Sequence, residues 1–263
     1  MTNRVTATLF PRILGATVLG FLVLPILAVV PASLSASSFI KIPPVGYSTR
    51  WYAAFVSDSD WMRAVFNSFE VAIIATGLSL GLGTLAALGL IRMTGIWRGI
   101  VTALMLAPMI VPVIMTSIAL YYLMRQVGLQ GSVVGLALGH CLLCLPFVVI
   151  NVGVSLARFD QSLWRAAAGL GATPLYIFRT VTLPAIKPGL LAGAAFAFIT
   201  SFDEVVIALF LSGPRSKTLP IKLWEEIRVE FTPVAAVGST AILIATVLLF
   251  ALVQASRART RDK

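Results

Sequence analysis

The chain has 263 residues, of which 59% are hydrophobic and 11% charged, far below the roughly 25% charged residues of a soluble domain. This composition excludes an ordinary water-soluble globular protein and favours a membrane protein. A net charge of +10 suggests nucleic acid as a partner, but the basic residues are dispersed without a patch of interleaved aromatics, so nucleic-acid binding is not expected.

Six apolar segments follow one another along the chain and predict an all-α, polytopic membrane protein with six transmembrane helices. A helix of about 20 residues crosses about 30 Å of hydrocarbon, because each residue rises 1.5 Å. We expect one transmembrane domain over residues 1–263. Its predicted spans are residues 13–30, 69–91, 100–123, 132–156, 188–212 and 234–255.

The first apolar segment has two interpretations. It follows Arg4 and Arg12, and the small residues at 33–37 resemble the cleavage region of a signal peptide. Its apolar stretch, residues 13–30, is longer than the usual 7 to about 15 residues of a signal peptide. We therefore favour a retained membrane span.

Basic residues are more frequent on one side of the predicted membrane than on the other. The connections and tail on the richer side carry Arg92, Arg98, Arg158, Arg165, Arg179, Lys187, Arg257, Arg259, Arg261 and Lys263. On the opposite side, basic residues are offset by Asp58, Asp60, Glu225, Glu226 and Glu230. The positive-inside rule thus predicts that the loop 158–187 and both termini are cytoplasmic.

Two features inside the spans bear on their shape and packing. Pro108 and Pro112 remove backbone hydrogen bonds from the third span and should bend it. Small residues recur at four-residue spacing, which lets helices approach closely, so we expect packing between spans or against a second subunit. These residues are Gly77, Gly81, Gly131, Gly135, Gly139, Gly189, Gly193, Ala197 and Ser201.

The loop at residues 158–187 is the longest polar interruption of the second half of the chain. Asp160 or Ser162 can cap a first short helix, and Gly171 stands where a left-handed residue ends it. Thr173, followed by a proline, can begin a second helix. A short helix with an alanine flank suits a partner's groove, while an amphipathic loop resting on lipid is the alternative.

Asp203 and Glu204 form an adjacent acidic pair within an apolar segment. Charges in a membrane are costly, and Glu204 falls near the same helical face as Gly193 and Ala197, so it should point to protein or water. Two interpretations remain open. The pair can line a route for a cationic substrate, or it can be bonded to a neighbouring helix.

The loop carries a pattern that is similar to a known one. Arg165-Ala166-Ala167, Gly171 and the run 181–184 resemble the "EAA" loop of permease subunits of binding-protein-dependent ABC importers. That pattern is Glu-Ala-Ala, three residues, Gly, nine residues and Ile-x-Leu-Pro. The departure is Arg165, where the family usually has Glu, so a contact that needs a carboxylate there is not supported. Asn67-Ser68 and the runs 107–112, 201–204 and 209–213 resemble the spermidine/putrescine branch, and the likeness extends over nearly the whole chain.

This resemblance implies a type I permease subunit in the bacterial inner membrane, with no catalytic residue and no cofactor of its own. The first helix of the loop would be the coupling helix that lies in a cleft of a cytoplasmic ATPase. The residues implied in coupling are Leu163, Trp164, Arg165, Ala166, Ala167, Gly171, Leu183 and Pro184. Asp203 and Glu204 are the candidates for the translocation path.

The implied partners are a dimeric ABC ATPase, a second permease subunit, membrane lipid and a periplasmic or lipid-tethered substrate-binding protein. The implied substrate is a small cation such as spermidine or putrescine. The same machinery for ferric iron or another small organic solute is the alternative.

Enzymatic alternatives have weaker support. The sequence has no Gly-Lys pair and therefore no phosphate-binding P-loop, so ATP hydrolysis requires a separate chain. An intramembrane serine protease would have to use Ser79 and His140, and a secondary transporter would normally show two related halves, which we do not find. His140 and Cys144 share a helical face, but two ligands are too few for a metal site.

Overall fold

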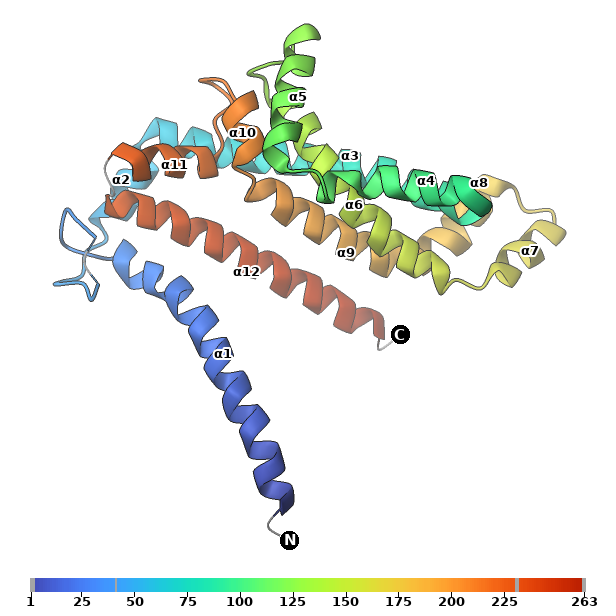
Figure 1. Ribbon diagram of the computed structural model, residues 1–263, viewed down its shortest axis with the longest axis horizontal. Helices are drawn as coiled ribbons and strands as arrows, with labels where there is room; N and C mark the ends of the chain where they lie inside the picture. The colour runs from blue at the N-terminus through green and yellow to red at the C-terminus, as the bar shows by residue number, and fades with distance from the viewer. Residues whose placement is uncertain (1–2, 41, 230–231, 262–263) are drawn as a thin grey trace. The chain divides into compact units, whose positions relative to one another are not determined.

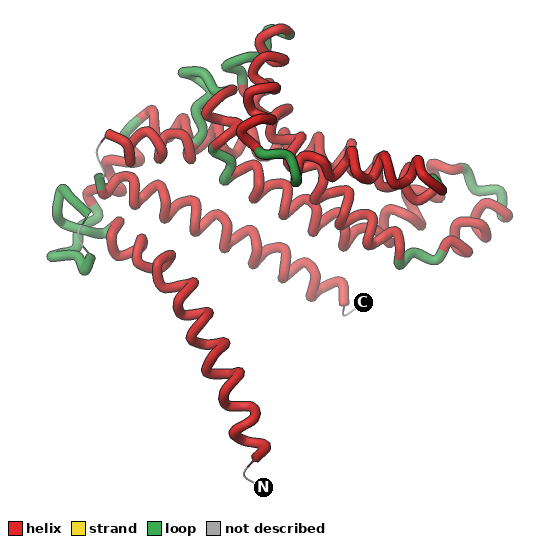
Figure 2. The backbone as a smooth tube through the Cα atoms, in the orientation of Figure 1, coloured by secondary structure: helices red, strands yellow, loops and turns green. Residues whose placement is uncertain are grey.

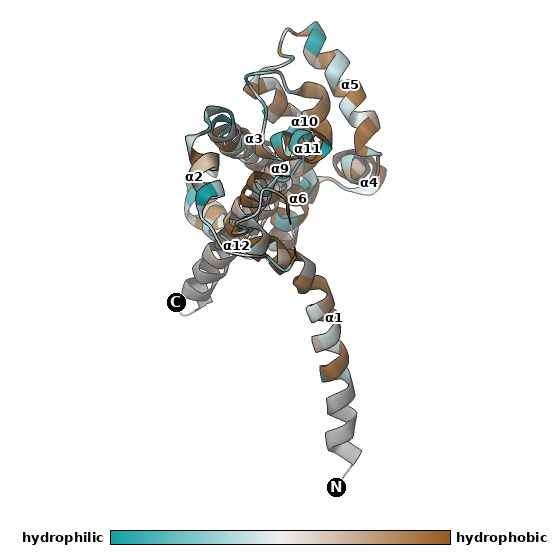
Figure 3. Ribbon diagram, turned by 90° about the vertical axis from the view of Figure 1, so that its left-hand side faces the viewer, coloured by the Kyte–Doolittle hydropathy of each residue, from teal (hydrophilic) through white to brown (hydrophobic). Residues whose placement is uncertain are grey.

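The computed structural model describes residues 3–40, 42–229 and 232–261, and within these ranges the regular structure is helical (Figures 1 and 2). Hydrophobic residues, brown in Figure 3, predominate along the long helices. The predicted all-α membrane class is thereby confirmed. The helices of the first part are α1 (Asn3–Ser33), α2 (Arg50–Ser57), α3 (Ser59–Arg92), α4 (Gly95–Leu106), the 3-10 turn η1 (Ala107–Met109), α5 (Val113–Gln126) and α6 (Val133–Ala157).

The second part of the chain contains two long helices and several short ones. They are α7 (Gln161–Gly169), α8 (Pro174–Ile177), the π-helical turn η2 (Phe178–Thr182), α9 (Leu183–Phe202), α10 (Val206–Leu211), α11 (Leu219–Val229) and α12 (Pro233–Arg261). The loop predicted at 158–187 therefore contains α7, α8, η2 and the start of α9.

The chain divides into two compact units, one of residues 1–62 with 223–244 and one of residues 63–222 with 245–263. In the first unit, aromatic side chains of α2 fix the connection that follows α1. The indole of Trp51 donates to the Ser35 carbonyl at 2.9 Å, and the Tyr52 hydroxyl lies 2.7 Å from the Ser33 hydroxyl.

The second unit is built around the contact between α6 and α9, the most extensive helix pair among the described residues. Small residues make this close approach possible. A Cβ atom on Gly193 would lie 3.1 Å from Val148 Cα, and one on Gly189 would lie 2.5 Å from the Asn151 carbonyl oxygen. The packing role predicted for the small residues of the fifth span is confirmed for this pair, where van der Waals contact rather than the hydrophobic effect drives association.

Four described helices are long and apolar enough to cross a membrane: Pro11–Ser33, Ser59–Arg92, Val133–Ala157 and Pro174–Phe202. A fifth candidate is the pair Gly95–Met109 and Val113–Gln126, bent by 96°. The described apolar part of α12, Pro233–Leu249, is shorter. This count is compatible with six spans without matching it helix for helix.

The bend in the third span lies where the two prolines predict it. Pro108 stands at the start of η1, and Pro112 is the N-cap of α5. Neither has a backbone N–H to donate, so a regular helix cannot continue across them. The predicted bend is confirmed.

The fifth span differs from the continuous helix expected over residues 188–212. The helical run begins earlier, at Pro174, and ends at Phe202, before the separate helix α10. At its start, η2 precedes Pro184, whose ring would clash with the carbonyl four residues earlier in a regular α-helix. At its end, the side chain of Glu204 bonds to the backbone of α10 and so favours a new helix start.

Candidate functional site

Helix α7 has the local structure that the sequence predicts. The Asp160 carboxylate accepts a hydrogen bond from the Ser162 N–H at 2.8 Å, and Gly171 adopts the left-handed conformation at φ +82°. Thr173 caps α8 by accepting from the Tyr176 N–H at 3.4 Å. The hydrogen bonds from Ser162 hold the pKa of Asp160 below its usual range. Both predicted caps and the predicted glycine are confirmed.

Helix α7 presents two different faces. Leu163, Ala166, Ala167 and Leu170 share one face by helical periodicity, and the exposed fraction is 53% for Leu163 and 89% for Leu170. Ala166 is also exposed, and Ala167 is half-buried. An apolar face that is this exposed in the chain is suited to a partner surface.

The other face of α7 lines a cavity, and the remaining predicted coupling residues lie elsewhere. Trp164 and Arg165 border the cavity rather than the exposed apolar face. Leu183 and Pro184 are exposed at the start of α9, after η2. The predicted coupling residues therefore occupy four places: the exposed face of α7, the cavity, the turn at Gly171 and the start of α9.

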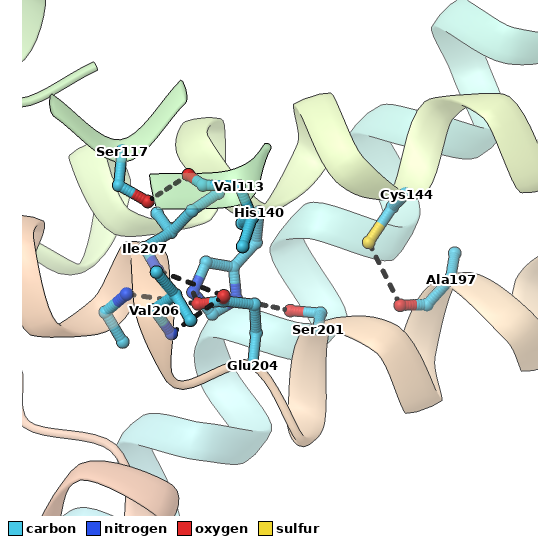
Figure 4. Close-up of polar contacts among 10 residues, drawn as sticks. Val113, Ser117, His140, Cys144, Ala197, Ser201, Glu204, Val206 and Ile207 are labelled. Carbon is cyan, nitrogen blue, oxygen red and sulfur yellow. Dashed lines mark hydrogen bonds and ion pairs between the residues drawn. The ribbon is translucent and has the colours of Figure 1, made fainter. Parts of the chain in front are cut away.

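The acidic pair is divided between two environments. Glu204 is buried, whereas Asp203 is exposed. Glu204 Oε1 accepts from the N–H groups of Val206 and Ile207 at 2.9 and 3.0 Å, and its Oε2 accepts from Ala208 at 3.1 Å (Figure 4). Glu204 thus acts as the cap of α10, and Asp203 is the carboxylate that solvent can reach.

His140 on α6 is the partner of Glu204 that sequence reasoning missed. Its Nδ1 lies 2.9 Å from Ser201 Oγ and its Nε2 lies 3.5 Å from Glu204 Oε2 (Figure 4). One helical turn away, the Cys144 thiol donates to the Ala197 carbonyl at 3.1 Å. His140 and Cys144 lie four residues apart on α6, as Ala197 and Ser201 do on α9. This shared spacing was the signal in the sequence that the two helices could contact each other at these residues.

Ser201, His140 and Glu204 are connected in the order of a hydrolase triad, but their surroundings do not suit hydrolysis. His140 is fully buried, Ser201 is 3% exposed, and the carboxylate is occupied by three backbone N–H groups. Ser79, the nucleophile of the protease alternative, is fully buried and donates to the Cys141 carbonyl at 3.3 Å. A substrate cannot reach either hydroxyl, so the cluster holds helices together.

A second polar cluster anchors the segment 212–218 to α3. The Asn67 amide donates to the carbonyls of Arg215 and Lys217 at 3.0 and 2.8 Å, and the Ser68 hydroxyl accepts from the Leu219 N–H at 2.8 Å. The side chains of Asn67 and Ser68 therefore hydrogen-bond to the backbone of a connection about 150 residues later in the chain. Among the residues that the structure describes, no group of three or more potential metal ligands occurs.

Comparisons with known proteins identify the family of this chain. The family described as "Binding-protein-dependent transport system inner membrane component" matches residues 79–262. The spermidine/putrescine transport system permease protein PotC of Escherichia coli (strain K12) is 30% identical over 243 residues, covering 92% of this chain and 90% of that protein. The putrescine transport system permease protein PotI of the same strain is 32% identical over 255 residues, with 92% and 90% covered.

A solved structure supports the fold. The crystal structure of a bacterial ABC transporter involved in the import of the acidic polysaccharide alginate matches with a TM-score of 0.75 at 18% identity, covering 96% of both chains. At this identity the likeness concerns the fold alone. The family match and the apolar helices place the protein in the inner membrane as a multi-pass chain. The chain belongs to the family of inner membrane permease components of binding-protein-dependent transport systems.

Proposed function

We propose that this permease forms part of the translocation path of an ATP-driven importer for a small cationic solute of the spermidine or putrescine type. The observation that carries the proposal is the similarity to permeases of spermidine and putrescine transport over 92% of the chain. Import of another small solute by the same machinery is the second candidate.

Asp203 supports a cationic substrate. It is an exposed carboxylate at a break between two helices, in a region that is otherwise apolar. A break in a membrane helix is tolerated only where it faces protein or water, so a carboxylate at the break does not face lipid. Such a carboxylate is suited to attract a cation. Glu204 would act indirectly in this path, by holding the break in place.

The exposed face of α7 supports a coupling role. ATP binding by a separate dimeric ATPase would displace α7, and η2 and α9 would carry the movement into the membrane. Because α9 packs closely on α6, the movement would reach the His140 and Glu204 contact. With both termini and α7 in the cytoplasm, a substrate-binding protein would approach from the opposite side, and a second permease would complete the path.

The proposal is tested by purification of the complex in parallel with an uptake assay. Ala166 and Ala168 are both exposed on α7 but lie about 200° apart around the helix at 100° per residue. Ala166→Arg should abolish co-purification of a P-loop ATPase, whereas Ala168→Arg is the matched control that retains it. A chain that purifies alone, or equal effects of the two variants, would contradict the coupling role.

Uptake of radiolabelled spermidine and putrescine by cells that express the complete system tests the substrate. ATP-dependent accumulation of either amine supports the proposal. If the complex assembles and hydrolyses ATP but accumulates neither amine, the substrate belongs to the second candidate, and the ligand that co-purifies with the binding protein identifies it.

A further inference from the structure

A cavity of about 650 Å³ lies behind α7, on the side opposite its exposed apolar face. It is bordered by the ends of α3 and α6, by α7, by the start of α8 and by η2. Its lining includes Leu88, Ile91, Leu156, Arg92, Trp164 and Arg165. The proposed function leaves this cavity without a role.

The wall of the cavity has an apolar part and a basic part. Leu88 and Ile91 come from the end of α3, and Leu156 comes from the end of α6. Arg92 directly follows Ile91 in α3. Trp164 and Arg165 come from α7. Apolar helix ends followed by basic residues and a tryptophan are typical of the boundary between hydrocarbon and head groups, so we infer that the cavity lies at this boundary.

Arg165 faces this cavity and not the proposed ATPase surface. Leu163 and Leu170 on the exposed face are two residues before and five residues after Arg165, about 200° and 140° away around the helix. The departure from the family pattern at this position thus changes the charge of the cavity. It does not change the apolar face on which a partner would dock.

Among the residues that the structure describes, neither Arg92 nor Arg165 forms a hydrogen bond or an ion pair. The carboxylate of Asp160, which feels the charge of Arg165, is already engaged by Ser162. Two unpaired arginines above an apolar wall match a ligand with an anionic head and an aliphatic tail.

We propose that the cavity binds one anionic phospholipid of the cytoplasmic leaflet. Arg92 and Arg165 hold the phosphate of its head group, and the half-buried Leu88 and Ile91 contact an acyl chain. Trp164 lies between the two parts. The lipid then connects the end of α3 to α7, so the position of α7 depends on the lipid composition of the leaflet.

The test measures lipid binding and needs no transport assay, so its outcome is independent of the proposed substrate. The purified complex in mild detergent is titrated with phosphatidylglycerol carrying brominated chains, which quench nearby tryptophan fluorescence, and with brominated phosphatidylcholine. The signal of Trp164 is the difference between the wild type and Trp164→Phe. We expect this signal to respond to phosphatidylglycerol at lower concentration than to phosphatidylcholine.

Removal of the guanidinium groups should remove the preference. In Arg92→Gln with Arg165→Gln, the apparent affinity for phosphatidylglycerol should fall about fivefold for each group lost, with phosphatidylcholine unchanged. Arg179→Gln is the matched control, because Arg179 is exposed on η2 and does not border the cavity. The variant with lysine at both positions keeps the charges and should keep most of the preference.

Three outcomes would overturn the proposal. They are an equal response to the two lipids in the wild type, an undiminished affinity for phosphatidylglycerol in the glutamine variant, and the same loss in Arg179→Gln. If the glutamine variant does not assemble, the variant with lysine at both positions provides the test. A lysine variant that assembles but does not prefer phosphatidylglycerol would contradict the proposed lipid site. Loss of the ATPase with unchanged lipid binding would assign the arginines to protein docking.

Discussion

Nε2 of His140 lies 3.5 Å from Oε2 of Glu204, so a histidine of α6 faces the carboxylate that caps α10. The same imidazole is bonded through Nδ1 to Ser201 on α9. One buried side chain therefore connects three helices at the point where the fifth span is interrupted. A movement of α9 that separates Ser201 from His140 would also disturb the cap of α10.

His140 is predicted to stabilise the fold through its contact with Ser201. His140→Ala removes the hydrogen-bond partner of the buried Ser201 hydroxyl, and leaving this hydroxyl unsatisfied should cost about 1 to 3 kcal/mol of stability. The melting temperature of the purified complex should fall. His140→Gln, which keeps a hydrogen-bonding side chain, should lose less. An alanine variant as stable as the wild type would show that the imidazole is not a structural link.

Asp203→Asn is predicted to lower uptake of a cationic substrate without changing the melting temperature. A carboxylate that contacts a cation contributes about 1.5 to 3 kcal/mol, so its loss should reduce uptake about tenfold or more. The exposed side chain has no described hydrogen bond whose loss would affect folding. Uptake at the wild-type rate would remove Asp203 from the path.

Glu204→Gln separates the two roles that the sequence leaves open for this residue. The amide retains one acceptor oxygen for the N–H groups of Val206 and Ile207, but its NH₂ cannot accept from Ala208. We expect the complex to assemble and uptake to be reduced. Loss of the complex from the membrane, measured by immunoblot of membrane fractions, would indicate that the role is structural.

Gly193→Ala is predicted to weaken the contact between α6 and α9. The added methyl group would lie 3.1 Å from Val148 Cα, and such overpacking costs about 1 to 3 kcal/mol. Gly81→Ala is the control, because no atom of the chain lies within 4 Å of its added methyl group. Thermal unfolding of both variants checks this. If Gly81→Ala lowers the yield of the complex instead, Gly81 contacts a second subunit.

Asn67→Ala is predicted to release the segment 212–218. The carbonyls of Arg215 and Lys217 lose their donor, which should cost about 1 to 3 kcal/mol. Because trypsin cleaves after both of these residues, limited proteolysis of the purified complex should become faster at this segment. Unchanged cleavage would mean that the segment is held without Asn67, by Ser68 and by Ser216, whose hydroxyl donates to the Gly131 carbonyl at 2.9 Å.

Local sequence determined the features that need only neighbouring residues. The caps at Asp160 and Thr173 join residues two and three positions apart, and the left-handed Gly171 follows from its own missing side chain. The bend at Pro108 and Pro112 follows from the absent N–H groups. These could be predicted because no distant residue is required to form them.

Tertiary structure decided the features that join distant residues. His140 and Ser201 are 61 positions apart, so local sequence patterns do not reveal their contact. Local patterns also do not reveal that Glu204 is buried while Asp203 is exposed. Periodicity alone predicted a continuous fifth span, since it does not reveal that a carboxylate will cap a new helix after Phe202. The cavity likewise requires Arg92 and Arg165 to be brought together by the packing of α3, α6 and α7.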